Sequence, residues 1–209
     1  MKYILMTMLF VGSLWAGDQE VFNKAQEAEN NNNYTKAIEL YKSISKHAIV
    51  QYNLGIMYEN GQGVKKNYKE AFKWYKKSSE QGYMLAQYNL GLMYNNGKGV
   101  SQNFKEAIKW YKLASKQGDE YAQCNLGLMY ANGQGVKKNL TEAVRLYSLS
   151  AAKGHATAQL NLGAAYANGE GVYKSYKEAC KWWLKASRQG NTQAKGYVNY
   201  LRKNGQICR

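Results

Sequence analysis

The sequence predicts an all-α protein, an α/α solenoid wound as a right-handed superhelix of 36-residue helix-turn-helix repeats. Three observations predict it: one residue pattern recurs every 36 positions, the 209 residues include no proline, and 20 of them are glycines. Helices joined by glycine turns can do without proline, whereas an all-β chain without any would be unusual. Apolar residues make up 45% of the chain, which provides a packed core and argues against global disorder.

Each repeat carries a Leu-Gly pair, an Asn-Gly-x-Gly-Val turn and a Glu-Ala pair followed by aromatic or leucine residues. The Leu-Gly pairs are Leu54-Gly55, Leu90-Gly91, Leu126-Gly127 and Leu162-Gly163. The turn glycines are Gly61 and Gly63, Gly97 and Gly99, Gly133 and Gly135, and Gly169 and Gly171. So many columns in one register indicate stacked supersecondary units.

The first helix of a repeat is recognised by its apolar face. In residues 119–131, Ala122, Leu126 and Tyr130 share a face at helical spacing. Gly127 lies beside that face, so we expect a neighbouring helix to approach closely there. Gly133 then predicts a left-handed stop.

A polar cap precedes the second helix. Asn139 and Glu142 have the spacing of a capping box, in which each side chain bonds the other's backbone N–H. The pattern recurs as Asn67/Glu70, Asn103/Glu106 and Ser175/Glu178. We predict helices near 49–60, 68–80, 84–96, 104–116, 120–132, 140–152, 156–168, 176–188 and 192–203. Two more are expected at the N-terminus, one from Asp18 to about Glu29 and one from Asn33-Tyr34 through Lys46.

The two helices of a repeat differ in where their apolar residues lie. The second helix is amphipathic: Ala71 and Tyr75 face inward, while Lys73 and Lys76 face water. The first helix is apolar on both sides, and one of its columns consists of Tyr52, Tyr88, Cys124 and Leu160. We therefore expect the first helices to be sandwiched between neighbours or to line a concave groove, with the second helices as the outer wall.

The ends of the chain differ from the repeats. Residues 1–16 have the features of a signal peptide: Lys2 is followed by an uncharged, mostly apolar stretch from Tyr3 to Trp15 and by Ala16. That stretch is too short to cross about 30 Å of hydrocarbon as a helix. We predict export to a periplasm or beyond, a tetratricopeptide-like cap over 18–47, four repeats over 48–191, and a capping helix with a tail over 192–209.

The chain is basic, with 29 lysines and arginines against 14 acidic residues and a net charge of +15. Such a charge favours acidic partners, such as anionic lipid, nucleic acid, wall polymers or acidic protein surfaces. A solvated lysine-rich surface is the more common explanation, so the charge alone identifies no partner.

The motifs Ala-Gln-x-Asn-Leu-Gly-x-x-Tyr, Asn-Gly-x-Gly-Val and Glu-Ala-x-x-Trp-Tyr resemble the Sel-one-like repeat family, a relative of tetratricopeptide repeats. The resemblance covers about residues 48–192, and 18–47 more loosely. It implies an α/α solenoid that scaffolds protein complexes. Exported members include the Helicobacter cysteine-rich proteins, which are assigned β-lactamase activity and carry cysteine pairs eight residues apart. With only Cys124, Cys180 and Cys208, this chain resembles a cysteine-poor relative.

No catalytic group is predicted. Ser-x-x-Lys occurs at Ser43–Lys46 and Ser150–Lys153, but neither Ser-Asp-Asn nor Lys-Thr-Gly follows, so a serine β-lactamase signature is rejected. The two histidines, His47 and His155, are too far apart to predict a metal site, and no cofactor is expected.

The cysteines allow two interpretations. Cys124 and Cys180 occupy columns of ordinary apolar residues, which a small hydrophobic side chain fills. Alternatively, in an exported protein, Cys180 and Cys208 form a disulfide that staples the tail to the last repeat.

The column chosen as a binding candidate is asparagine: Asn53, Asn89, Asn125 and Asn161 directly precede each Leu-Gly pair. On a helical wheel each lies at the edge of the core-facing stripe. Their amides fit the backbone of an extended peptide; by the other interpretation they hydrogen-bond between adjacent repeats and stiffen the stack. Both roles are compatible, and tetratricopeptide folds provide the analogy for the first.

The predicted function is an exported scaffold that binds a protein or peptide in the groove of its first helices, with no nucleic-acid partner expected. Two alternatives stay open. One is a β-lactam hydrolase of the cysteine-rich repeat type, which the family resemblance alone implies. The other is a binder of anionic envelope polymers through the lysine-rich outer face, which would weaken steeply with salt.

Overall fold

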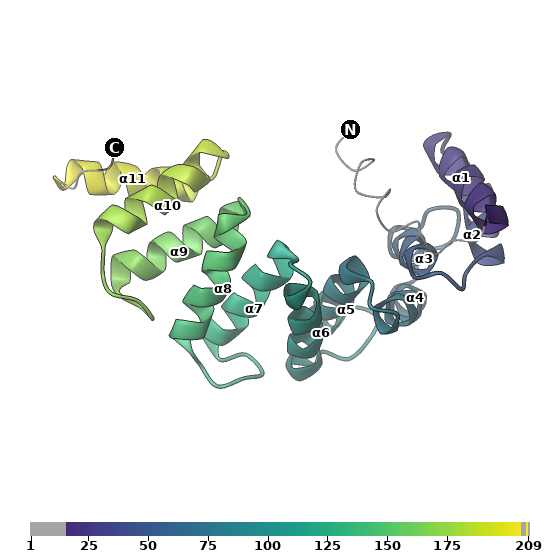
Figure 1. Cartoon of the computed structure of the whole chain (residues 1–209), viewed down its shortest axis with the longest axis horizontal. Helices are drawn as coiled ribbons and strands as arrows, with labels where there is room; N and C mark the ends of the chain where they lie inside the picture. The colour runs from purple at the N-terminus through teal and green to yellow at the C-terminus, as the bar shows by residue number, and fades with distance from the viewer. Residues whose placement is uncertain (1–15, 206–207, 209) are drawn as a thin grey trace. The chain divides into compact units, whose positions relative to one another are not determined.

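The computed structural model describes residues 16–205 and residue 208. Within them, all regular secondary structure is α-helix, which confirms the predicted all-helical solenoid (Figure 1). The helices are α1 (Ala16–Asn30), α2 (Tyr34–Ser43), α3 (Ala48–Asn60), α4 (Tyr68–Glu80), α5 (Met84–Asn96), α6 (Phe104–Lys116), α7 (Glu120–Asn132), α8 (Leu140–Ala152), α9 (Ala156–Asn168), α10 (Tyr176–Arg188) and α11 (Thr192–Lys203). In the described part of the chain, no helix has the length and apolar character that a membrane span requires. Apart from Ala16, the predicted signal peptide lies outside the described residues.

The helices alternate between two types. We call α3, α5, α7 and α9 helices A, and α4, α6, α8 and α10 helices B; α1 and α2 form an A-like and B-like pair, and α11 is a last A-like helix. From α4 onward the helices begin and end at the predicted residues. The bounds of α1 and α3 differ from the predicted ones by at most two residues, whereas α2, predicted to run through Lys46, ends at Ser43. Beyond it Ile44 is buried, and Asp18 of α1 binds both Lys46 and His47, so the chain turns toward α1 instead.

The chain divides into two compact units, residues 1–102 and 103–209, and each is described by itself. The first unit contains α1 to α5, and its core includes Phe22, Tyr41 and Leu54. The second contains α6 to α11, with one cluster around Tyr147 and another around Trp183. Within a unit the core is a series of thin layers between successive helices, because each helix packs mainly on the next one along the chain.

Polar side chains cap helices B as predicted. Asn67 accepts hydrogen bonds from the backbone of Lys69 and Glu70 at the start of α4. The other bond of the predicted capping box, from the Asn67 N–H to the Glu70 side chain, is wrong. The Asn67 N–H donates to the Tyr58 carbonyl at 2.8 Å, and the Glu70 carboxylate instead pairs with Lys73 at 2.6 Å. The equivalent glutamates of the other repeats pair in the same way: Glu106 with Lys109, Glu142 with Arg145 and Glu178 with Lys181.

A glycine brings helices A and B of a repeat into direct contact. A Cβ atom added to Gly127 on α7 would lie 2.7 Å from the ring of Tyr147 on α8. Gly55 stands in the same relation to Tyr75, at 2.5 Å, and Gly163 to Trp183. Real Cβ atoms do not approach a ring so closely, so the predicted close packing at Gly127 is confirmed.

Successive repeats are joined by a second glycine and a buried glutamine. Gly135 has a positive φ of 69°. A Cβ added there would lie 2.5 Å from Phe104 Cβ at the start of the preceding helix B. Gln159, only 3% exposed, donates from Nε2 to the Ala151 carbonyl at 3.2 Å, near the end of the preceding helix B. Gln51, Gln87 and Gln123 are buried and bond preceding carbonyls in the same way. These glutamines add a side-chain donor to carbonyls at or just beyond the end of the preceding helix. The Ser79, Ser115 and Ala151 carbonyls also accept from a backbone N–H of the turn.

One repeat junction holds a buried carboxyl group. Asp119 is 3% exposed and caps α7 by accepting from the Ala122 N–H at 2.6 Å. Burial raises the pKa of this carboxyl, although the Ala122 hydrogen bond opposes the shift. Asn191 caps α11 at the equivalent position, so an amide fits the same geometry.

We predict that Gly127→Leu destabilises the second unit by about 1–3 kcal/mol, because the new side chain overpacks the contact with Tyr147. The measurement is the free energy of unfolding in denaturant. Gly196→Ala is the matched control: an added Cβ on that helical glycine meets nothing within 4 Å. Alanine there should hold or raise stability, because it favours the helix. An unchanged unfolding midpoint for Gly127→Leu would contradict the close contact.

We predict that Asp119→Asn is at least as stable as the parent at pH 7, because it keeps the cap and removes a buried charge. The raised pKa means that Asp119 contributes stability below about pH 3.8, and that this contribution is lost as pH rises through the folded-state pKa. The advantage of the asparagine variant should therefore disappear in acid. Asp119→Ala loses the cap and should cost about 0.5–2 kcal/mol. Thermal melting from pH 3 to 7 checks this; equal losses for both variants would contradict it.

Candidate functional site

The four asparagines of the predicted binding column lie in the middle of helices A. They are Asn53 on α3, Asn89 on α5, Asn125 on α7 and Asn161 on α9, and all four are half-buried. Two belong to the first unit and two to the second. The column is therefore described as two pairs, each within one unit.

In the first unit each asparagine bonds a tyrosine of the preceding helix. The pairs are Asn53 with Tyr41 and Asn89 with Tyr75. Each tyrosine hydroxyl donates its own proton to a carboxylate: Tyr41 to Glu29 and Tyr75 to Glu59, both at 2.7 Å. Because that proton is committed, the amide must donate to the hydroxyl through its nitrogen. The amide oxygen then keeps its capacity to accept.

The surroundings hold these tyrosines in their protonated form. Burial raises the pKa of Tyr75 far above that of an exposed phenol, and the charge of Glu59 raises it further. Burial likewise raises the pKa of Tyr41, and Glu29 adds to the effect. The hydroxyls consequently act as hydrogen-bond donors and not as acids.

The second unit lacks this carboxylate. Ala131 of α7 occupies the position that Glu59 has in α3, so Tyr147 faces no equivalent acceptor. The amide nitrogen of Asn161 is buried and has no hydrogen-bond partner among the described residues. Asparagine thus stiffens the stack in the first unit and is not used in that way at Asn161. The tyrosine–carboxylate bonds were not predicted from the sequence, although an acidic residue near the end of a helix A, as at Glu59, indicates where such an acceptor lies.

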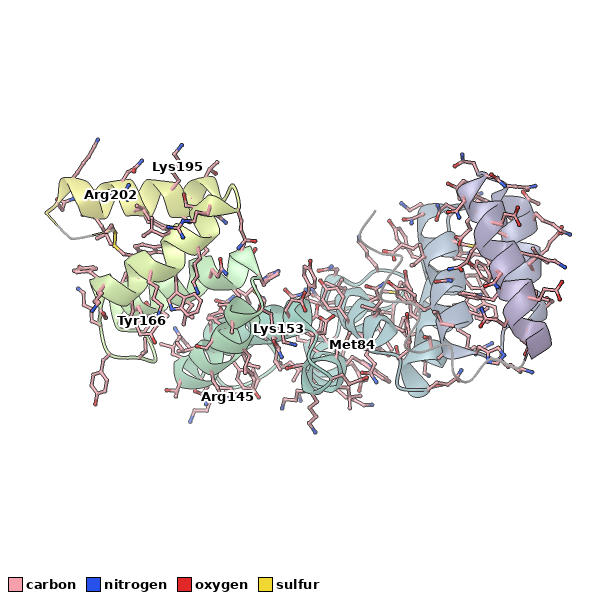
Figure 2. All side chains as sticks on the ribbon, turned by 45° about the horizontal axis from the view of Figure 1, so that its top comes forward. Met84, Arg145, Lys153, Tyr166, Lys195 and Arg202 are labelled. Atoms are coloured by element: carbon pink, nitrogen blue, oxygen red, sulfur yellow. A yellow bond between two sulfur atoms is a disulfide. The ribbon has the colours of Figure 1, made fainter. Side chains whose placement is uncertain are left out.

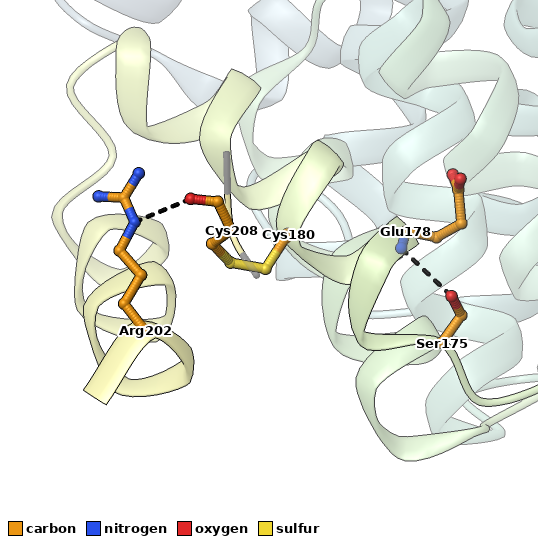
Figure 3. Close-up of a disulfide and its surroundings, with 5 residues drawn as sticks. All are labelled: Ser175, Glu178, Cys180, Arg202 and Cys208. Atoms are coloured by element: carbon orange, nitrogen blue, oxygen red, sulfur yellow. Dashed lines mark hydrogen bonds between the residues drawn. A yellow bond between two sulfur atoms is a disulfide. The ribbon is translucent and has the colours of Figure 1, made fainter. Parts of the chain in front are cut away.

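A disulfide joins Cys180 of α10 to Cys208 in the tail, with Cα atoms 5.4 Å apart (Figure 3). Both cysteines are buried, and Arg202 Nε donates to the Cys208 carbonyl at 3.0 Å. The bridge therefore fastens the chain beyond α11 to α10. Cys124 is free and buried, and burial raises the pKa of its thiol to about 12, which makes it unreactive. Among the described residues, no three His, Cys, Asp or Glu side chains group as metal ligands would.

Five segments of the chain, residues 31–47, 48–83, 85–119, 120–155 and 156–191, match the Sel1 repeat family. The chain belongs to the Sel1 repeat family. Sel1 repeats build scaffolds that typically mediate protein–protein interaction, and this Sel1 repeat protein has that architecture.

Solved structures of other repeat proteins are similar to it. A protective antigen of uropathogenic Escherichia coli with an SLR fold is 30% identical, with a TM-score of 0.86; the match covers 90% of this chain and 42% of the antigen. This Sel1 repeat protein thus spans less than half of that relative. A Sel1 repeat protein of Oxalobacter formigenes is 35% identical, with a TM-score of 0.79, over 86% of this chain and 74% of that one.

Helicobacter pylori cysteine rich protein B is also similar, at 29% identity and a TM-score of 0.52. The match covers 63% of this chain and 95% of that protein. This is the group that the sequence resemblance identified. No functionally curated protein matches the chain.

Neither Ser-x-x-Lys match in this Sel1 repeat protein pairs its serine with its lysine. Each serine hydroxyl donates to a backbone carbonyl, and each lysine binds elsewhere. Ser43 donates to the Leu40 carbonyl, and Lys46 binds the Asp18 carboxylate. Ser150 donates to the Glu120 carbonyl, and Lys153 to the Gly118 carbonyl. In the second match, Ser150 bonds within its own repeat and Lys153 reaches the preceding repeat.

Lysines on helices B lie over half-buried aromatic rings. The Lys77 ammonium is 4.5 Å from the centre of the Trp74 ring, and Lys185 is equally close to Trp182. Such cation–π contacts hold the charges near the surface without neutralising them. The outer wall thus presents positive charge, as the sequence predicted.

Proposed function

We propose that this Sel1 repeat protein is an exported scaffold that binds an extended peptide segment of a protein partner along its helices A. The asparagine column carries the proposal. A half-buried amide recurs at one position of four helices A, at Asn53, Asn89, Asn125 and Asn161.

The chemistry of the amide supports two roles at once. Where its partner is known, at Asn53 and Asn89, the nitrogen donates into the stack and the oxygen keeps its acceptor capacity. Acceptors repeated at the solenoid spacing fit the N–H groups of an extended backbone, which recur at regular intervals. The side-chain nitrogen stiffens the scaffold, and the oxygen is available to the partner.

We predict that replacing Asn125 and Asn161 together by alanine weakens partner binding about five- to 150-fold, since two hydrogen bonds of about 0.5–1.5 kcal/mol each are lost. The partner is first captured from envelope extract, and its affinity for the parent and the variant is then measured. Asn161→Ala should not lower the melting temperature, because its buried nitrogen has no partner to lose.

Two controls separate binding from folding and from charge. Asn53→Ala removes the bond to Tyr41 and should lower stability by about 0.5–1.5 kcal/mol. Reversing Lys73 and Lys109 on the outer wall to glutamate should leave a partner bound along helices A almost unaffected. If the lysine changes abolish binding and the asparagine pair does not, the partner is an anionic polymer or surface held on the outer wall.

Export is the second part of the proposal. It is supported by the apolar stretch after Lys2 and by the disulfide between Cys180 and Cys208, since disulfides persist in oxidising compartments. We predict that residues 1–16, fused to an alkaline phosphatase lacking its own leader, yield active enzyme outside the cytoplasm. Leu9→Arg within the apolar stretch should abolish that activity. Equal activity from both fusions would contradict a role for this segment in export.

A further inference from the structure

A hollow of about 540 Å³ lies within the second unit, and half of the residues that line it are aromatic. Tyr176 and Trp183 come from α10, and Tyr197 and Tyr200 from α11. Lys174, in the turn before α10, is the one charged side chain in the lining. None of the four asparagines contributes to it.

The hollow arises where the repeat pattern changes. Tyr197 stands on α11 where a helix A has its asparagine, and Trp183 stands where the preceding helices B have tyrosine. The two rings pack with their centres 4.7 Å apart. Trp183 is buried, and its Nε1 donates to the Leu160 carbonyl at 3.0 Å, so it forms a fixed back wall.

The front of the hollow is open and apolar. Tyr200 is 65% exposed, and Tyr197 and Tyr176 are each exposed by more than a third. In the described chain, α11 is the last helix, and no helix B follows to cover these rings. Aromatic side chains gathered at an open concave surface are typical of a binding site.

The charge around the hollow is positive. The Lys174 ammonium lies 4.9 Å from the centre of the Tyr176 ring, at the rim. From 167 to 203 the acidic residues are Glu170 and Glu178, and Glu178 is paired with Lys181. The basic residues of that stretch are Lys174, Lys177, Lys181, Lys185, Arg188, Lys195, Arg202 and Lys203. The last three lie on α11, where Figure 2 labels Lys195 and Arg202. This field attracts acidic groups, and a second copy of a chain with a net charge of +15 is repelled.

We propose that the hollow binds an acidic peptide segment carrying one large aromatic or aliphatic side chain. That side chain enters between Tyr197 and Tyr200 and packs on Trp183. A carboxylate beside it meets Lys174 at the rim, and the positive charge of the surrounding stretch attracts the other acidic groups of the segment. The inference deepens the proposed protein-binding function, but it uses a separate set of residues.

The first experiment uses fluorescein-labelled peptides and the full disulfide-bonded chain, with binding measured by fluorescence anisotropy. The probe is Glu-Asp-Glu-Phe-Glu-Asp-Glu; one comparison peptide has Ala in place of Phe, and another has Lys in place of every acidic residue. The alanine peptide should bind about 10- to 150-fold more weakly, because burying a phenylalanine side chain is worth about 1.5–3 kcal/mol. The lysine peptide should not bind.

The second experiment locates the bound peptide. Tyr200→Ala should weaken binding of the probe about 5- to 30-fold, the effect expected for an aromatic anchor. Lys174→Glu should weaken it and make the affinity less dependent on salt. Tyr173→Ala is the matched control, because Tyr173 is 95% exposed beside Lys174 and does not line the hollow. The indole N–H resonance of Trp183, assigned by Trp183→Phe, should shift when the probe binds.

Each contrary result overturns the proposal. Equal affinity of the phenylalanine and alanine peptides, or equal effects of Tyr200→Ala and Tyr173→Ala, would mean diffuse attraction to positive charge. Absence of binding by the probe would mean that the hollow does not take such a segment. Since Asn125 and Asn161 lie outside the lining, loss of partner binding in their double variant would still support the proposed function. If the double variant binds its partner as the parent does and the probe still binds, only the proposed role of the asparagine column is contradicted.

Discussion

The contact between a helix-A glycine and a helix-B aromatic ring is the constraint on which each repeat depends. Because Gly55 has no side chain, the Tyr75 ring lies directly against α3. From that position its hydroxyl reaches Glu59 at 2.7 Å, near the end of the same helix, and receives the amide of Asn89 from the next repeat. A side chain at Gly55 would displace the ring and disturb both bonds. The position of the Tyr75 ring therefore provides both the apolar packing within a repeat and the polar contact between repeats.

Most helix boundaries could be predicted because local residues set them. A glycine with positive φ, such as Gly61, ends helix A, and a side-chain cap, such as Asn67, begins helix B. The end of α2 could not be predicted in this way, because Asp18, distant in sequence, holds the chain beyond it. The buried glutamines were not foreseen either. Glutamine is usually a surface residue, and only the place of the preceding helix end explains why Gln159 is buried.

The candidate site was predictable in position but not in chemistry. The period identified the asparagines, whereas the tyrosine hydroxyl that meets Asn53 comes from another helix and needs the packed structure. The aromatic hollow was missed because α11 was treated as a capping helix. Its signal is visible in the register of the repeat, where Tyr197 replaces asparagine. The disulfide partner of Cys180 depends on the path of the tail, so the sequence left two interpretations open.

The disulfide makes the two ends of the described chain differ in how they are held. At the N-terminal end, α1 is held by apolar contacts and by partly exposed ion pairs from Asp18, which salt screens. At the other end, a covalent bond between Cys180 and Cys208 clasps α11. A repeat array has no contacts beyond nearest neighbours to oppose peeling from an end. Tension on the tail passes through this bond to Cys180, so α11 stays inside a covalently closed loop and cannot be peeled away from the tail.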